Sequence, residues 1–212
     1  MGQIIKFPVR AAKFGYKRVP RRACKEENPA QLHLFSADTA QILHLALEQG
    51  LFEHALLLDE KGDARAIDAY LKAIAEQDCV ADAYCNLGII ESKQGRISKA
   101  FDCFTTCLKF EPRHFEAHFN LGNLYFEVND FRLAQIHYEI AAEVDPAFPN
   151  VYFNLALVLS INNEIVAAIN ALARYQQLAP PNEAGNADDL LENLKKSLAV
   201  TKSSSTGVPS QR

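Results

Sequence analysis

The chain has 212 residues, of which 49% are hydrophobic and 23% charged, so it is long and apolar enough to bury a core. It carries 22 lysines and arginines against 26 acidic residues, a net charge of −4. No stretch approaches the roughly eighteen apolar residues of a transmembrane helix, and the N-terminus lacks the apolar segment of a secretory signal, so we expect a folded, non-membrane protein.

The cysteines favour a reducing compartment. Their number is odd, and two of them share one predicted helix. Reduced thiols are typical of intracellular proteins, so we expect a cytoplasmic location. The five are Cys24, Cys79, Cys85, Cys103 and Cys107.

Residues 1–36 are predicted to form a flexible basic arm. The first 25 residues hold eight lysines and arginines and no acid, whereas the rest of the chain holds 14 basic and 26 acidic residues, a balance of −12. Three roles are open: the arm binds nucleic-acid phosphates, acts as a transit peptide, or lies on the acidic body of its own chain. The candidate side chains are Lys13, Lys17, Arg18, Arg21 and Arg22.

The segment QLHLF, Gln31–Phe35, follows the arm. It resembles the short peptide with which bacterial replication and repair proteins dock on the sliding clamp. The alternative is that its apolar residues begin a cap over the first repeat, continued by the amphipathic residues 37–50. A synthetic peptide of residues 29–36 would separate the two by calorimetry.

An internal repeat dominates the rest of the chain. The segment FNLGNLYFEVNDFRLAQIHYEIAAEVDP at 119–146 has counterparts at 85–112 and 153–180, so one pattern recurs at a fixed period. Each unit is predicted to hold two amphipathic helices, at about 82–93 and 98–110 in the second unit. The recurring positions are Ala66/Ala100/Ala134/Ala168, Tyr70/Phe104/Tyr138/Leu172, Leu87-Gly88/Leu121-Gly122/Leu155-Ala156, Gly95/Asn129/Asn163 and Pro112/Pro146/Pro180.

Each recurring residue type has a structural reason. Gly95 and its asparagine equivalents permit a left-handed turn between the two helices, and the prolines end the second helix. The small residues Gly88 and Gly122 are expected where the paired helices approach closely, with the large aromatic column beside them.

The Leu-Gly…Ala…Phe…Pro pattern resembles the tetratricopeptide repeat family over residues 81–180. The resemblance implies an all-α fold, an α-solenoid of antiparallel helix pairs with about three to four units and a C-terminal capping helix. The expected parts are an arm at 1–36, a repeat domain at 37–180, a capping helix at 181–200 and a disordered tail at 201–212. The approximate units are 47–80, 81–114, 115–148 and 149–180.

The resemblance also implies a function. Members of this family bind other proteins in a concave groove lined by the first helix of each unit. An asparagine precedes each Leu-Gly or Leu-Ala pair, and some members use such a ladder to hold extended peptides by their backbones. The alternative is that these asparagines bond within their own helix pair. The candidate partner-binding residues are Asn86, Phe119, Asn120, Asn123, Phe126, Phe153 and Asn154.

We therefore predict a non-catalytic scaffold or adaptor for an unidentified protein or peptide, with a nucleic-acid-associated adaptor as the alternative. No catalytic residues, cofactor or metal are expected. The cluster Cys103, Cys107, His114 and His118 has a linker too short for a zinc finger, so core cysteines and surface histidines are expected. The positions where family members carry a cationic clamp for chaperone tails hold Asp82, Cys85, Ile89, Glu116 and Phe119, which argues against such a ligand.

Overall fold

The computed structural model describes residues 15–20 and 50–205. The described residues are helical apart from turns and the segment 15–20, and they contain no β-strand. No described helix is both long and apolar enough to cross a bilayer.

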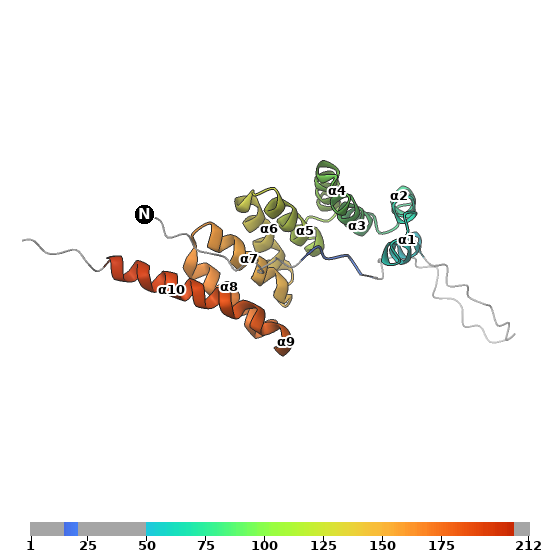
Figure 1. The fold of residues 1–212 in the computed structure, drawn as a ribbon. Helices are drawn as coiled ribbons and strands as arrows, with labels where there is room; N and C mark the ends of the chain where they lie inside the picture. Colours follow the sequence, from blue (N-terminus) through green and yellow to red (C-terminus); the bar gives the residue numbers. More distant parts are fainter. Residues whose placement is uncertain (1–14, 21–49, 206–212) are drawn as a thin grey trace, which may run out of the picture.

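Four antiparallel helix pairs follow one another along the chain, and α10 lies along α8 at the C-terminal end (Figure 1). Each pair also packs on the next, which is the arrangement of an α-solenoid. The pairs are α1 (Leu51–Glu60) with α2 (Ala66–Ala75), α3 (Val80–Lys93) with α4 (Ile97–Phe110), α5 (Phe115–Glu127) with α6 (Phe131–Val144), and α7 (Pro149–Ile161) with α8 (Ile165–Leu178).

The turn inside each pair has a left-handed residue, as predicted for Gly95, Asn129 and Asn163. Its φ is +69° at Gly62, +74° at Gly95, +61° at Asn129 and +63° at Asn163. The amide of Asn129 bonds the carbonyl of Phe126, and the next amide reaches back to Tyr125, which satisfies carbonyls that the helix end leaves free. Glycine and asparagine tolerate this conformation, so the turn residue sets where each hairpin closes.

In the α3–α4 and α5–α6 pairs, the two helices approach closely at a glycine. A Cβ atom on Gly122 would lie 2.5 Å from Cε1 of Tyr138, and one on Gly88 would lie 2.8 Å from Cε1 of Phe104. Tyr138 and Phe104 are completely buried, so their rings have little freedom to move away. The prediction of close helix contacts at these glycines is confirmed.

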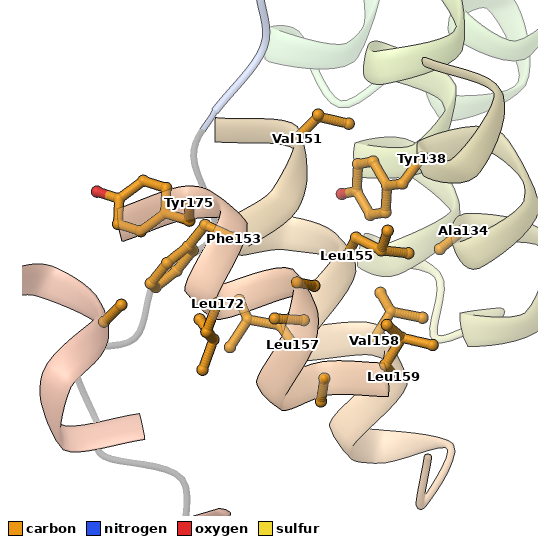
Figure 2. Packing of buried hydrophobic residues seen from close by; sticks show 14 of the residues in the cluster. Ala134, Tyr138, Val151, Phe153, Leu155, Leu157, Val158, Leu159, Leu172 and Tyr175 are labelled. Atoms are coloured by element: carbon orange, nitrogen blue, oxygen red, sulfur yellow. The ribbon is translucent and has the colours of Figure 1, made fainter. Parts of the chain in front are cut away.

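The buried side chains form two hydrophobic clusters along the stack, one centred on α1–α5 and one on α5–α10. Figure 2 shows the second cluster, in which Leu155 lies near Tyr138 and Phe153 lies beside Tyr175. Residues of α7 and α8 pack with those of α6, so the last pair shares its core with the pair before it. The repetition therefore stabilises the fold by giving each pair a neighbour.

A C-terminal helix covers the last pair. After α9 (Pro181–Ala184) and a 3₁₀ turn at Gly185–Ala187, α10 runs from Asp188 to Ser205. Leu190 and Leu194 of α10 are buried within the second cluster. The helix extends into residues 201–205, where a disordered tail was expected. Each residue added to an existing helix gains a backbone hydrogen bond without a new nucleation cost, which favours this extension.

We predict that Gly122→Leu lowers the free energy of unfolding by roughly 1–3 kcal/mol, because the new side chain overlaps the buried Tyr138 ring. Urea denaturation checks this. Gly185→Ala is the control, since a Cβ there meets only Asp188 at 3.7 Å. Equal stability of the two variants would contradict the described packing.

Candidate functional site

Residues 15–20 run along the face formed by the first helices of the pairs, seen as the blue trace near α1, α3 and α5 in Figure 1. We call the recess that holds residues 16–19 the arm groove. Asn120 accepts a hydrogen bond from the Lys17 amide at 2.7 Å and donates one to the Lys17 carbonyl at 2.8 Å. Asn86 does the same for Val19, at 2.8 and 3.2 Å. Two asparagines thus bind the backbone of alternate residues in an extended segment.

The two asparagines are held in place by the helices around them. Both are completely buried, Asn86 on α3 and Asn120 on α5. The carboxamide of Asn86 also donates to the Tyr70 hydroxyl at 3.2 Å, and that of Asn120 donates to the Cys85 sulfur at 3.6 Å. Since a carboxamide offers both a donor and an acceptor, it pairs with a peptide unit regardless of the side chain that the peptide carries.

Lys17 enters an aromatic and acidic pocket. Its Nζ lies 4.4 Å from the centre of the Phe115 ring and 4.0 Å from that of Phe148. The Glu116 carboxylate lies 3.9 Å from the same nitrogen and is only 2% exposed. The pocket therefore offers a cation two aromatic faces and a negative charge.

Arg18 and Val19 fill two different environments. Nη2 of Arg18 donates a hydrogen bond to Oδ1 of Asp59 on α1 at 2.9 Å, and Nε lies 2.6 Å from Oδ2 of the same carboxylate as a charge contact without hydrogen-bond geometry. The Val19 side chain is completely buried in the first hydrophobic cluster. The segment is thus bound by charge contacts, by burial of an apolar side chain and by hydrogen bonds to its backbone. The prediction of a flexible arm is therefore wrong for residues 16–19.

Tyr16 ends the bound segment. Its hydroxyl donates to Glu127 at 2.8 Å and accepts from Ser92 at 2.6 Å, and its ring stacks on Phe104 at 6.4 Å. Burial, followed by the hydrogen bond and charge of Glu127, raises the pKa of Tyr16 well above its usual value, so the hydroxyl keeps its proton.

The third predicted ladder residue, Asn154, bonds to Asn123, which was predicted to lie beside the ladder. Nδ2 of Asn154 donates to Oδ1 of Asn123 at 2.9 Å, and the Tyr138 hydroxyl donates to the same oxygen at 2.7 Å. Nδ2 of Asn123, which is completely buried, has no hydrogen-bond partner among the described residues.

The three predicted phenylalanines play different parts. Phe119 is buried against Phe148 at a ring separation of 5.5 Å, and Phe153 is buried against Tyr175 at 5.3 Å. Phe126 packs edge-on against Phe131 at 5.4 Å, across the turn of its own helix pair. Phe119 and Phe126 thus have packing partners inside the fold. The rings of Phe115, Phe148 and Phe104 contact the bound segment.

Only two members of the predicted cysteine–histidine cluster lie together in the structure. Cys107 and His114 come together with Cys85, their donor atoms all within 4.8 Å, and Cys103 and His118 are not part of this set. The Cys85 thiol lowers the pKa of Cys107 to about 7. Both ring nitrogens of His114 already have partners, Asp82 at 2.8 Å and the Ala117 amide at 3.1 Å. The imidazole therefore lacks a free lone pair for a metal, and it serves as the N-cap of α5.

The expectation of surface histidines is wrong. His114 is completely buried and His118 is 5% exposed, because both satisfy polar groups at the junction between pairs. The Nε2–H of His118 donates to the Pro112 carbonyl at 3.0 Å, which leaves its Nδ1 to accept from Nδ1–H of His137, also at 3.0 Å. Both rings are neutral in this arrangement.

Several predicted features lie outside the described residues: Lys13, Arg21, Arg22, the segment 31–35 and the expected front cap at 37–49. Cys85, Cys103 and Cys107 are free thiols as expected, whereas Cys79 is disulfide-bonded.

The sequence did not reveal Asp59, Ser92, Phe115, Glu127 or Phe148 as contact residues for the segment. One signal was present: the basic arm and the acidic body carry opposite charges, and one of the three roles considered for the arm was contact with that body. The individual pairings remained hidden because they join residues 41 to 111 positions apart.

Comparison with known proteins identifies the repeats. Residues 81–114 and 119–183 match two family models, each described as tetratricopeptide repeat. These two segments of the chain are tetratricopeptide repeats. Proteins of this family are generally interaction modules, so the chain is a protein-interaction scaffold in the broad sense.

The curated relatives that the chain matches are much longer than the matched regions. BBSome complex member BBS4 of Bos taurus is 28% identical over 121 residues, which cover 57% of this chain and 23% of that protein. Tetratricopeptide repeat-containing protein trd-1 of Caenorhabditis elegans is 27% identical over 145 residues, 68% of this chain and 18% of that protein. This tetratricopeptide repeat chain thus spans between about a sixth and a quarter of these two relatives.

Solved structures share the fold. The first repeat domain of Spaghetti (RPAP3), bound to the HSP90 peptide SRMEEVD, has a TM-score of 0.52 at 22% identity and covers 56% of this chain and 93% of that one. The crystal structure of MamA has a TM-score of 0.53 at 20% identity, with coverage of 72% and 96%.

The histidine pair generates a pH prediction. Burial, and then the charge of His118, lowers the pKa of His137 to about 4. A histidine with a lowered folded-state pKa contributes stability above its unfolded pKa of about 6.5, and this contribution is lost as the pH falls towards 4.

We expect the free energy of unfolding to fall by roughly 1–2 kcal/mol more between pH 7 and 5 in the unaltered chain than in His137→Phe, which keeps an aromatic ring against Tyr125. Urea titrations at the two pH values measure this difference. Identical pH dependence of the two chains would refute the buried neutral pair.

Proposed function

We propose that this scaffold binds an extended peptide segment of a partner protein in the arm groove, with Asn86 and Asn120 pairing to its backbone. The observation that carries the proposal is the bound segment itself: both asparagines exchange two hydrogen bonds with alternate residues of a peptide. An extended chain presents equivalent peptide groups at every second residue, so the ladder and an extended ligand share one period.

The geometry favours recognition without chemistry. Asn86 and Asn120 offer amide groups, and the carboxylates of Asp59 and Glu116 contact cations, so these groove residues do not make up an activated nucleophile and its base. We therefore infer a non-catalytic role, in which Asn123 and Asn154 extend the same ladder. A cytoplasmic location stays a prediction, which the free thiols favour and the disulfide at Cys79 does not.

The nucleic-acid alternative is less favoured by the described contacts. Lys17 and Arg18 contact Glu116 and Asp59, so phosphates would have to displace these carboxylates. The Spaghetti domain binds an acidic peptide with three carboxylate side chains, SRMEEVD. The present groove places acids where that ligand class would need cations.

A backbone test uses the full chain with Val19→Asp, which places a charge in a completely buried slot and so weakens the bound segment. The probe is a fluorescent peptide GYKRVP, the sequence of residues 15–20. N-methylation at the lysine and valine removes the two amide donors, and we expect affinity to fall at least about fivefold by fluorescence polarisation.

N-methylation at the arginine is the control, because no described residue accepts a hydrogen bond from that amide; we expect a change within about twofold. An unmodified peptide that fails to bind, or equal affinity of all the methylated peptides, would contradict the proposed function.

A further inference from the structure

The arm groove also discriminates between side chains. We propose that it selects a basic strand with lysine and arginine in adjacent positions, and that residues 16–19 are its resident ligand, which a partner's basic strand must displace. This inference rests on the proposed function, since it names the ligand class and the regulation of the same groove.

The lysine position is the more specialised pocket. Phe115 and Phe148 lie within 4.4 Å of Nζ of Lys17, and the Glu116 carboxylate lies 3.9 Å away. Aromatic faces attract a cation through their quadrupole, and the attraction grows as water is excluded. A compact ammonium group fits between two rings, whereas a neutral or acidic side chain would remove the ammonium contact of the buried Glu116 carboxylate, which also lies 3.7 Å from Nδ1 of His114.

The arginine position has a different chemistry. Asp59 presents both oxygens to Nη2 and Nε of Arg18, and its side chain is 9% exposed. A planar guanidinium places one nitrogen against each oxygen, Nη2 as a hydrogen-bond donor and Nε as a charge contact, and an ammonium cannot form both contacts in the same geometry. The order lysine then arginine is therefore part of the specificity, in addition to the total charge.

The neighbouring positions complete the pattern. Val19 occupies a closed apolar slot, and Tyr16 lies between the Phe104 ring and the polar groups of Ser92 and Glu127. The groove thus accepts an aromatic residue, lysine, arginine and a small aliphatic residue in sequence. The chain carries this sequence itself, at Tyr16–Val19.

Tethering makes the resident segment an effective competitor. A segment joined covalently to its own groove experiences an effective concentration in the millimolar range, so a free peptide of similar intrinsic affinity binds weakly until the segment is released. The unaltered chain is then a closed scaffold, and partner strands with stronger contacts or more ladder pairings open it.

Fluorescence polarisation with three peptides on the full-length Val19→Asp chain tests the selectivity. The first is GYKRVP, the second is GYRKVP with equal charge and composition, and the third is GYAAVP. We expect the exchanged peptide to bind at least about threefold more weakly and the alanine peptide at least about tenfold more weakly.

Receptor variants assign the pockets. In the same chain, Asp59→Asn should remove most of the preference for arginine at the second basic position, and Glu116→Gln should reduce the preference for lysine at the first. Asp102→Asn, which changes an exposed acid on α4, is the matched control and should leave all three affinities unchanged.

The resident-ligand part is tested by adding GYKRVP to the unaltered chain, where we expect binding at least about tenfold weaker than to the Val19→Asp chain. Equal affinity for the two chains would overturn it. Equal affinity of the three peptides would overturn the proposed selectivity and leave backbone recognition intact. Equal affinity of the methylated and unmodified peptides would contradict the proposed function itself.

Discussion

The structure depends on a hydrogen-bonding constraint at Asn86 and Asn120. A completely buried carboxamide must have partners for its donor and acceptor, since an unsatisfied one costs about 1–3 kcal/mol. Among the described residues, the helices supply these two side chains with the Tyr70 hydroxyl and the Cys85 sulfur, and a segment from the start of the chain supplies the peptide groups. The need to satisfy the ladder thus explains why an extended ligand belongs on this face.

The repeats make that constraint recur at a fixed spacing. Gly122 lets α5 approach α6 until its backbone touches Tyr138, and the left-handed Asn129 closes the hairpin between them. Gly88 makes the equivalent contact with Phe104 in the preceding pair, and a left-handed residue closes all four hairpins, so the first helices present equivalent positions side by side. Repetition of the same local packing thus produces a surface on which equivalent side chains recur at the spacing of alternate residues in an extended peptide.

The repeat architecture followed from the sequence because its signals are local. A glycine or asparagine at a turn, a small residue opposite a large ring and a proline after a helix each act within a single repeat unit. The arm groove was only partly foreseen, since the asparagine column was visible and its occupant was not. Phe126 was assigned to the groove because it lies on the first helix of its unit. The repeat period alone does not show that its ring packs against Phe131 at the turn of the same helix pair.

The cysteines and histidines show the same limit. Spacing in the chain grouped Cys103 with Cys107, but the stacking of α3 on α4 and α5 brings Cys85 to Cys107 and His114. Likewise, the contacts of Lys17 and Arg18 with acidic side chains depend on where a segment 41 or more residues away comes to lie. The opposite charges of the arm and the body indicated an attraction between them. They did not show which basic residue contacts which acidic residue.

Amide hydrogen exchange of the full chain, resolved by NMR at Lys17, Arg18 and Val19, tests the central claim most directly. If the asparagine ladder binds the backbone of this segment, the amides of Lys17 and Val19 exchange slowly and the Arg18 amide between them exchanges fast. Asn120→Ala should then release the Lys17 amide first. Exchange of all three amides at the rate of an unstructured peptide would contradict the account.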